Sequence, residues 1–396
     1  MSSESQIPIA AKVASRRFAS RIAVFYATLF GVTGVQLPFF TVWLKAIGID
    51  ATWIGIITAV PPVTRFTVLP MVTAAAERRQ RLRGAIIATA FATAVGFALV
   101  GTQHQPFLVL AAYALTCCVW TPMVPLTDAY ALRGVRQFGL SYGPLRLWGS
   151  AAFVVCALIS GLLLGYVAEV HLIWIITAVT VTGALVSLTL RPLQRPPAAS
   201  APTAGARKLL RDPAFLAIIV SSALIQSSHS AYYIFASIAW QQAGLSGLTI
   251  AGLWVLGVVA EIVLFALSPR FALPPAMLVV IAAASAVARW TITALDPPLP
   301  ILAVVQLGHG LTFGLTQVGI MGLMVHHVPG HVMARGQGYL AACSGIVAST
   351  TSILCGMVYA RYGLGAYYMM AAMAGAGGLV MWLARRRYPQ STASGG

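Results

Sequence analysis

The chain has 396 residues, of which 59% are hydrophobic and only 8% are charged, and its formal net charge is +17. Soluble domains carry roughly 25% charged residues, so this composition excludes a water-soluble globular protein, and we expect lipid to be its main solvent. The basic excess lies in the segments between long apolar runs, which argues against nucleic-acid binding.

Twelve apolar segments are long enough to cross a membrane, which takes about 20 helical residues. Strands of a membrane barrel would be roughly 9–11 residues long and would alternate in polarity, and these segments do neither. We therefore predict an all-α polytopic membrane protein with spans at 21–44, 51–76, 83–101, 106–132, 142–166, 171–190, 213–242, 247–268, 274–295, 298–325, 333–360 and 364–384.

A segment rich in Pro, Ala and basic residues, 191–212, lies near the middle of the chain and is typical of a linker. It separates a predicted N-terminal six-helix bundle (1–190) from a C-terminal six-helix bundle (213–396). Gly48, after the first span, has a counterpart in Gly244, after the seventh. We expect two pseudo-symmetric halves, which in transporters hold the substrate between them.

Lys and Arg are concentrated on one side of the predicted membrane. They gather at the N-terminus, after every second span and in the linker, and only Lys45 and Arg361 fall on the opposite side. Because cytoplasmic loops carry the positive charge, we expect both termini in the cytoplasm of a bacterial-type inner membrane. The first apolar run continues through Trp43, too long for the ~7–15-residue core of a cleavable signal peptide.

Few ionisable residues remain inside the predicted spans. A charge at the bilayer centre costs at least about 2.5–3.5 kcal/mol, so such residues indicate either a function or a buried pair. They are Arg65, Asp128, Arg146, Glu261, Arg289 and His309, accompanied by His229 and by the amides Gln36, Gln226 and Gln306.

Glu261, Arg289 and His309 fall about 11–15 residues into three successive spans, which places them at a similar depth at 1.5 Å per residue. An acid, a base and an imidazole at one depth suit a proton relay, because a buried carboxyl holds its charge only while a cation is near. The alternative is a static Glu261–Arg289 ion pair with His309 as a core histidine.

Asp128 and Arg146 lie near the ends of the fourth and fifth spans, and Phe153 follows Arg146 by two helical turns on the same face. An arginine beside an aromatic ring suits a substrate with a ring and an anionic or polar group. Interfacial ion pairing and ordinary packing are the alternatives, and a structural role is equally open for Arg65. We expect further substrate contacts from Gln36, His229, Tyr232 and Gln306.

Signatures of enzymes and metal sites are missing from the sequence. It contains no HExxH, GxSxG or GxxxxGK[ST] pattern, so we expect neither an enzyme nor a cofactor, and any energy must come from a gradient. His326, His327 and His331 have no acid or cysteine nearby in sequence, which favours a solvated loop over a metal site. The five cysteines all fall inside predicted spans.

Six stretches carry a resemblance to the major facilitator superfamily, and most closely to its phenylpropionate-permease group of proton symporters. They are PLTDAYAL (125–132), YGPLRLWGS (142–150), HSAYYIF (229–235), GVVAEI (257–262), ARW (288–290) and QLGHGLTFG (306–314). The resemblance implies a monomeric proton-coupled symporter that imports a small organic substrate by alternating access, with an aromatic carboxylic acid as the first candidate. A sugar or nucleoside substrate, efflux by antiport and a transporter-like sensor stay open.

The chain is similar, more distantly, to the lactose permease. In that family an acid, an arginine and an aromatic on helices 4 and 5 hold the sugar, which implies this role for Asp128, Arg146 and Phe153. An acid, an arginine and a histidine on helices 8, 9 and 10 form its coupling network, which implies that role for Glu261, Arg289 and His309, with Asp128 as a further proton-carrier candidate.

The chain departs from the lactose permease at two positions on helix 10, where Thr312 replaces a glutamate and Gln306 replaces a lysine. The loop signature between helices 2 and 3 lacks both glycines but keeps Glu77, Arg78 and Arg81, which the resemblance implies act as a charged gate.

Overall fold

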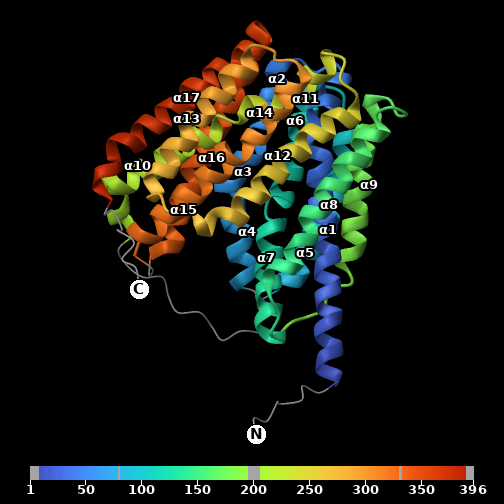
Figure 1. The fold of residues 1–396 in the computed structure, drawn as a ribbon. Helices are drawn as coiled ribbons and strands as arrows, with labels where there is room; N and C mark the ends of the chain where they lie inside the picture. Colours follow the sequence, from blue (N-terminus) through green and yellow to red (C-terminus); the bar gives the residue numbers. More distant parts are fainter. Residues whose placement is uncertain (1–8, 79–80, 195–205, 330–331, 389–396) are drawn as a thin grey trace. The chain divides into compact units, whose positions relative to one another are not determined.

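The computed structural model describes residues 9–78, 81–194, 206–329 and 332–388. Every regular element in these ranges is a helix, and no strand occurs among them. The predicted all-α fold is therefore confirmed (Figure 1).

Ten stretches of the described residues are long and apolar enough to cross a membrane, and an eleventh is added if the bent pair Ala51–Phe66 and Val68–Ala76 counts as one span. The longest contains α17 (Ala366–Ala384) and most of α16 (Met333–Tyr362), joined by the turn Gly363–Gly365, and so covers two predicted spans. The stretches are Val13–Ala46, Leu82–Gly101, Pro106–Phe138, Tyr142–Leu163, Glu169–Ser187, Pro213–Gln242, Gly247–Arg270, Pro275–Ala294, Leu299–His327 and Arg335–Arg387.

Contacts group the chain into two compact units, which we describe separately. The first comprises residues 1–47 and 67–199, and the second comprises 48–66 and 200–396. Residues 48–66 thus pack with the second unit, although they precede the linker and fall within the range of the predicted N-terminal bundle. The division into bundles of 1–190 and 213–396 stays a prediction.

The first unit is built around its N-terminal helix. That helix, α1, runs along α8 and α9, while α5 packs on α6 and α9. At Gly34 of α1 a side chain would lie 2.4 Å from the carbonyl oxygen of Phe153, so glycine allows α8 to approach closely. The helices are α1 (Ile9–Ala46), α4 (Val68–Arg78), α5 (Leu82–Gly101), α6 (Pro106–Trp120), α7 (Met123–Phe138), α8 (Tyr142–Leu163) and α9 (Leu172–Ser187).

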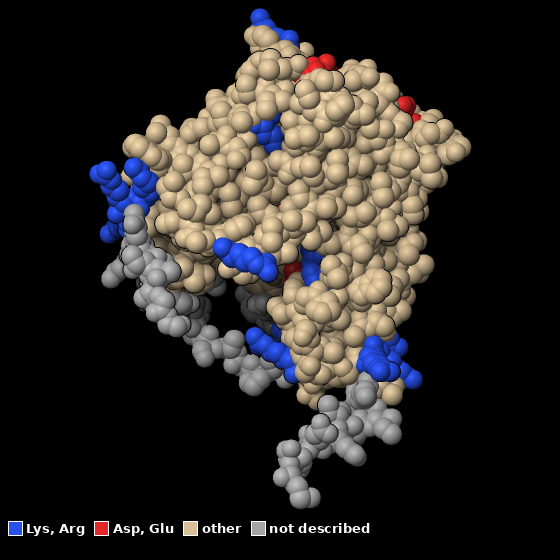
Figure 2. All heavy atoms as spheres, in the orientation of Figure 1, with Lys and Arg blue, Asp and Glu red and all other residues tan. Residues whose placement is uncertain are grey.

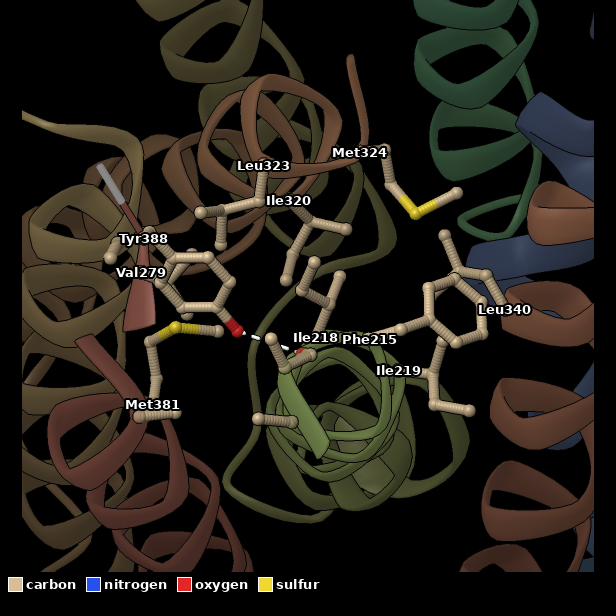
Figure 3. Packing of buried hydrophobic residues seen from close by; sticks show 14 of the residues in the cluster. Phe215, Ile218, Ile219, Val279, Ile320, Leu323, Met324, Leu340, Met381 and Tyr388 are labelled. Atoms are coloured by element: carbon tan, nitrogen blue, oxygen red, sulfur yellow. Dashed lines mark hydrogen bonds between the residues drawn. The ribbon is translucent and has the colours of Figure 1, made fainter. Parts of the chain in front are cut away.

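The second unit contains α2 (Ala51–Thr58), α3 (Val60–Phe66), α10 (Pro213–Ser227), α11 (Ser230–Gln242), α12 (Gly247–Leu267), α13 (Pro275–Ala294), α14 (Leu299–His309), α15 (Leu315–His327), α16 (Met333–Tyr362) and α17 (Ala366–Ala384). One of its apolar cores joins α10, α13, α15 and α17 (Figure 3). Its members Phe215, Ile218 and Met324 are fully buried. This core holds the ends of several helices together.

A polar contact closes the same end of this unit. The Tyr388 hydroxyl donates to the carbonyl of Ala214 over 2.9 Å (Figure 3), and Asp212, which caps α10, contacts His327. Burial alone would raise the pKa of the Asp212 carboxyl, but hydrogen bonds from His327 and from the Ala214 amide hold that pKa below its usual value. Burial, and then the Asp212 charge, raises the pKa of Tyr388 to about 12.

The visible surface carries few charges. Figure 2 shows broad areas without Lys, Arg, Asp or Glu, and the basic side chains gather in a few clusters. Many large apolar residues are exposed, among them Phe107, Leu115 and Val304 at 67–68%. Such a surface suits a protein solvated by lipid.

α2 and α16 cross at a pair of glycines in the second unit. A side chain at Gly356 would lie 2.7 Å from the carbonyl oxygen of Ala51, and one at Gly55 would lie 2.6 Å from that of Ser352. Small residues let helix backbones approach in this way.

We expect Gly356→Ala to lower the thermal unfolding midpoint of the purified protein, because the added methyl group pushes α2 away at a cost of about 1–3 kcal/mol. Gly252→Ala on α12 is the matched control, since no atom outside its own helix lies within 4 Å of the added carbon. It should leave the midpoint unchanged or slightly raised. Equal midpoints for the two variants would contradict this packing.

Candidate functional site

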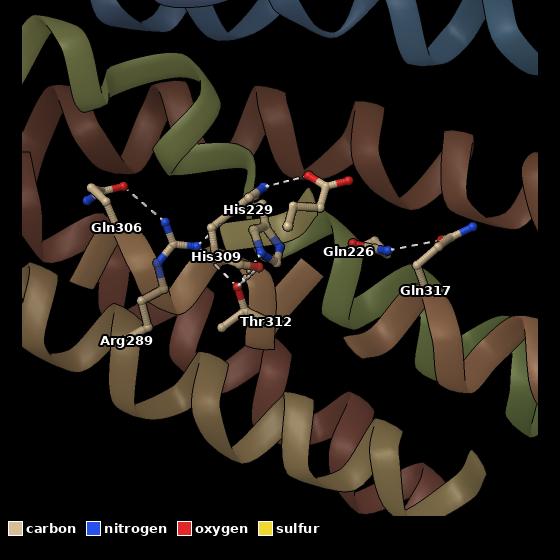
Figure 4. Close-up of polar contacts among 8 residues, drawn as sticks. Gln226, His229, Arg289, Gln306, His309, Thr312 and Gln317 are labelled. Atoms are coloured by element: carbon tan, nitrogen blue, oxygen red, sulfur yellow. Dashed lines mark hydrogen bonds and ion pairs between the residues drawn. The ribbon is translucent and has the colours of Figure 1, made fainter. Parts of the chain in front are cut away.

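Arg289 lies on α13 in the interior of the second unit, where only 4% of its surface is exposed. Its guanidinium donates to three neutral acceptors, each at 3.1 Å: His309 Nδ1, Thr312 Oγ1 and Gln306 Oε1 (Figure 4). Among the ion pairs of the described residues, none joins Arg289 to a carboxylate. The buried cation is therefore held by hydrogen bonds to neutral groups and not by a direct ion pair within the described residues.

This contact fixes the hydrogen positions of His309. A guanidinium can only donate, so Nδ1 must accept and the ring hydrogen must sit on Nε2. Nε2 lies 3.6 Å from the carboxylate of Glu261, which is close enough for electrostatic attraction. The result is a chain from Arg289 through a neutral imidazole to Glu261, so the acid and the arginine are linked indirectly and the predicted static ion pair is not formed.

A second branch runs from Arg289 to His229. His229 Nδ1 lies 3.2 Å from the carbonyl of Ile225, which only accepts, so Nδ1 carries the hydrogen. Nε2 of the neutral ring then accepts from the Thr312 hydroxyl at 3.0 Å. Thr312 thus receives a hydrogen bond from Arg289 and passes one on to His229, and both imidazoles stay uncharged beside the guanidinium.

Two irregular helices create this arrangement. α10 ends at Ser227 and α11 begins at Ser230, so the apolar stretch 213–242 is broken next to His229. A π-helical turn, η4 (Gly310–Gly314), lies between α14 and α15 and begins directly after His309. Such turns insert an extra residue and occur often at functional sites, and here both His309 and Thr312 face Arg289.

Aromatic rings complete the surroundings of the cation. The Arg289 guanidinium lies 4.7 Å from the ring centre of Tyr232 and 4.5 Å from that of Trp290. Trp290 is itself anchored by a 3.1 Å hydrogen bond from its indole nitrogen to Ser228. Cation–π contacts away from water contribute about 2 kcal/mol, which further favours a charged arginine here.

The first unit contains a separate polar cluster. Both Tyr26 and Tyr142 donate their hydroxyls to Oδ1 of Asp128, at 2.6 and 2.8 Å. Arg146 instead lies over the Phe30 ring, 3.5 Å from its centre. The predicted partnership of Asp128 with Arg146 is therefore not formed: both tyrosines donate to one oxygen of the carboxylate, and the guanidinium lies on an aromatic ring.

The remaining predicted residues lie as follows. Gln36 donates to the Tyr113 hydroxyl over 3.1 Å, and Phe153 is buried on α8, where its backbone contacts Gly34. Glu77 and Arg78 end α4, and their side chains are outside the described part of the chain, as is His331.

Arg81 stands at the start of α5, and its amide bonds to the carbonyl of Ala76. Arg65 lies in α3 of the second unit. The carboxylate beside His327 comes from Asp212, 115 residues away in sequence, which sequence spacing did not reveal.

Four residues of the two polar clusters were not predicted from the sequence. Thr312 was noted only as a departure from the lactose permease, yet it joins Arg289 to His229. Tyr26, Tyr142 and Phe30 went unnoticed because aromatic residues in a span are common. For Thr312 the available signal was its position three residues after His309, on the same side of a helix.

Residues 19–370 match the family model described as MFS_1 like family. The chain belongs to this family. The resemblance to the major facilitator superfamily is thereby confirmed, and the protein is a multi-pass membrane transporter.

Two curated relatives cover most of the chain. It is 32% identical over 362 residues to the Escherichia coli K12 protein named "Probable 3-phenylpropionic acid transporter", a match spanning 89% of this chain and 94% of that one. It is 27% identical over 357 residues to the maltose permease of Geobacillus stearothermophilus, spanning 87% and 89%. Both relatives are transporters by name.

A solved structure of a mutant of the nucleoside transporter NupG superposes with a TM-score of 0.83 over 93% of this chain and 99% of that one, at 14% sequence identity. At this identity the likeness concerns the fold alone.

We expect Thr312→Val to destabilise the protein by about 1–3 kcal/mol, because Arg289 and His229 both lose the hydroxyl that they share while buried. Thermal unfolding in detergent measures the effect. Thr316→Val is the matched control: Thr316 is equally buried, but its hydroxyl bonds only to the carbonyl one turn back. An equal loss of thermal stability in Thr316→Val would contradict a special role for the Thr312 hydroxyl.

Proposed function

We propose that this protein is a proton-coupled symporter that imports a small organic substrate, and that Glu261 carries the coupled proton. The observation behind this proposal is the chain of contacts from buried Arg289 through His309 to Glu261. In the proposed orientation both termini lie in the cytoplasm of an inner membrane. The proton gradient supplies the energy, with no cofactor and no catalysed reaction, and the protein acts as a monomer.

Glu261 is favoured over His309 as the proton carrier. A proton on His309 Nδ1 would point at the N–H groups of Arg289, 3.1 Å away, and would add a second positive charge. The imidazole therefore takes no proton while that contact lasts. The side chain of Glu261 is 24% exposed, against 7% for His309, so it is the less enclosed of the two groups.

Coupling then follows from the position of Arg289. While the guanidinium is held by His309, Thr312 and Gln306, its charge supports an ionised Glu261 through the polarised imidazole. A conformational change that draws Arg289 away leaves the carboxylate without that support, and a carboxyl group in a poorly solvated site then favours its protonated form. Substrate movement and proton uptake are linked in this way.

We propose an aromatic carboxylate as the substrate class, with Arg146 as its anchor. No carboxylate among the described residues lies within 4.0 Å of Arg146, whose fork geometry suits bidentate binding of a substrate carboxylate. The Phe30 and Tyr26 rings beside the guanidinium offer stacking surfaces. The name of the 32% identical relative points in the same direction.

A sugar or nucleoside is the second candidate, because a 27% identical relative is named a maltose permease and a structural neighbour is a nucleoside transporter. The paired tyrosine hydroxyls on Asp128 would suit substrate hydroxyls equally well. A further alternative is efflux by proton antiport, in which the same residues would bind the substrate and the proton but the substrate would leave the cell.

Proteoliposomes containing the purified protein test this proposal. We expect addition of 3-phenylpropionate to cause proton uptake into wild-type vesicles, seen as alkalinisation outside. Glu261→Gln should abolish the pH change, because the amide cannot take up a proton. A panel of sugars and nucleosides follows under the same conditions.

Two further variants sharpen the test. Asp296→Asn, in the exposed turn after α13, is the control acid and should behave as wild type. Asp128→Asn tests the other intramembrane acid. Transport with no pH change contradicts proton coupling. Proton uptake that survives in Glu261→Gln but disappears in Asp128→Asn would identify Asp128, in the first unit, as the proton carrier.

A further inference from the structure

A cavity of about 590 Å³ opens in the second unit, away from Arg289. It lies where α13 begins at Pro275, where α15 ends at His327, and where the turn Arg385–Arg387 follows α17. The transport proposal makes no use of it.

The polar side of this cavity is basic. Arg385, Arg386, His326 and His327 contribute to its lining. His327 already has a partner in Asp212, but no carboxylate of the described residues lies within ion-pairing distance, 4.0 Å, of either arginine. The cavity therefore presents two arginines whose charge no described carboxylate offsets within ion-pairing distance.

The other side of the cavity is apolar. Pro274, Met277 and Leu323 line it. A small hydrated anion would offer these side chains no apolar surface to pack against. A ligand with an anionic head and an apolar body fits both sides.

The neighbouring residues mark the level of a membrane surface. Trp382, half-exposed at 46%, lies one turn before Arg385, whose guanidinium is 3.9 Å from the Trp382 ring centre. Tryptophan and arginine are enriched where a helix leaves the hydrocarbon region. This pattern of residues indicates that the cavity lies at the level of the lipid headgroups.

We propose that this cavity binds the phosphate-bearing headgroup of an anionic membrane phospholipid, with Arg385 and Arg386 as the anion ligands and the Met277–Leu323 wall against the glycerol and upper acyl chain. Basic pockets between membrane helices bind such headgroups by charge-assisted hydrogen bonds.

The test uses full-length protein purified in an uncharged detergent and titrated with fluorescent phosphatidylglycerol or phosphatidylcholine. We expect wild type to prefer phosphatidylglycerol by roughly tenfold or more, since each arginine near an anionic headgroup contributes about fivefold. Arg385→Gln with Arg386→Gln should remove the preference. Arg387→Gln is the matched control, because Arg387 is exposed in the same turn but does not line the cavity, and it should keep the preference.

Three results would overturn the proposal. One is a loss of the phosphatidylglycerol preference in Arg387→Gln as large as in the double glutamine variant, which would indicate general attraction to the basic surface. The double lysine variant, Arg385→Lys with Arg386→Lys, keeps both charges and should retain most of the preference. A loss of the preference in that variant is the second contradicting result. The third is full displacement of the lipid by glycerol 3-phosphate or inorganic phosphate at equal concentration, which would make the ligand a soluble phosphate.

Discussion

The buried guanidinium of Arg289 is the constraint on which the second unit is built. Inserting such a charge into a bilayer costs at least about 2.5–3.5 kcal/mol, and no carboxylate of the described residues offsets it directly. Three hydrogen bonds from the charged group, each contributing about 1.5–3 kcal/mol, exceed that cost. A lysine could not accept a hydrogen bond and would repel the guanidinium, so the amide of Gln306 suits this position, where the lactose permease has a lysine.

Helix irregularities lie at the same contacts. The π-helical turn between α14 and α15 begins directly after His309 and contains Thr312, and both residues bond to Arg289. The break at His229 places a second imidazole beside Thr312. The first unit uses another solution, in which tyrosine hydroxyls satisfy Asp128 and an aromatic ring attracts Arg146. Arg289 is thus enclosed by hydrogen-bond acceptors, whereas the Arg146 guanidinium lies on an aromatic ring, and no ion pair of the described residues joins either arginine to a carboxylate.

Glu261, Arg289 and His309 could be predicted from the sequence because a charge inside an apolar span is conspicuous. The rise per residue of a helix then gives the depth of each side chain in the membrane. The all-α fold followed from the length of the apolar runs. Pairings between distant positions were out of reach: Tyr26 and Asp128 are 102 residues apart, and only helix packing joins them. Thr312 escaped because a hydroxyl carries no charge, and the π-helical turn has no marker in hydrophobic periodicity. Residues 48–66 pack with the second unit through a glycine contact, which sequence order does not indicate.

The most direct test is nitrogen-15 NMR of histidine-labelled protein in lipid at neutral pH, with His309→Gln used to assign the His309 signals. The account predicts a neutral imidazole with its hydrogen on Nε2 and an accepting Nδ1, because Arg289 can only donate. Replacing Arg289 by Gln should release this preference. A hydrogen on Nδ1, or a doubly protonated ring in the wild type, would contradict the arrangement of Arg289, His309 and Glu261 from which proton coupling was inferred.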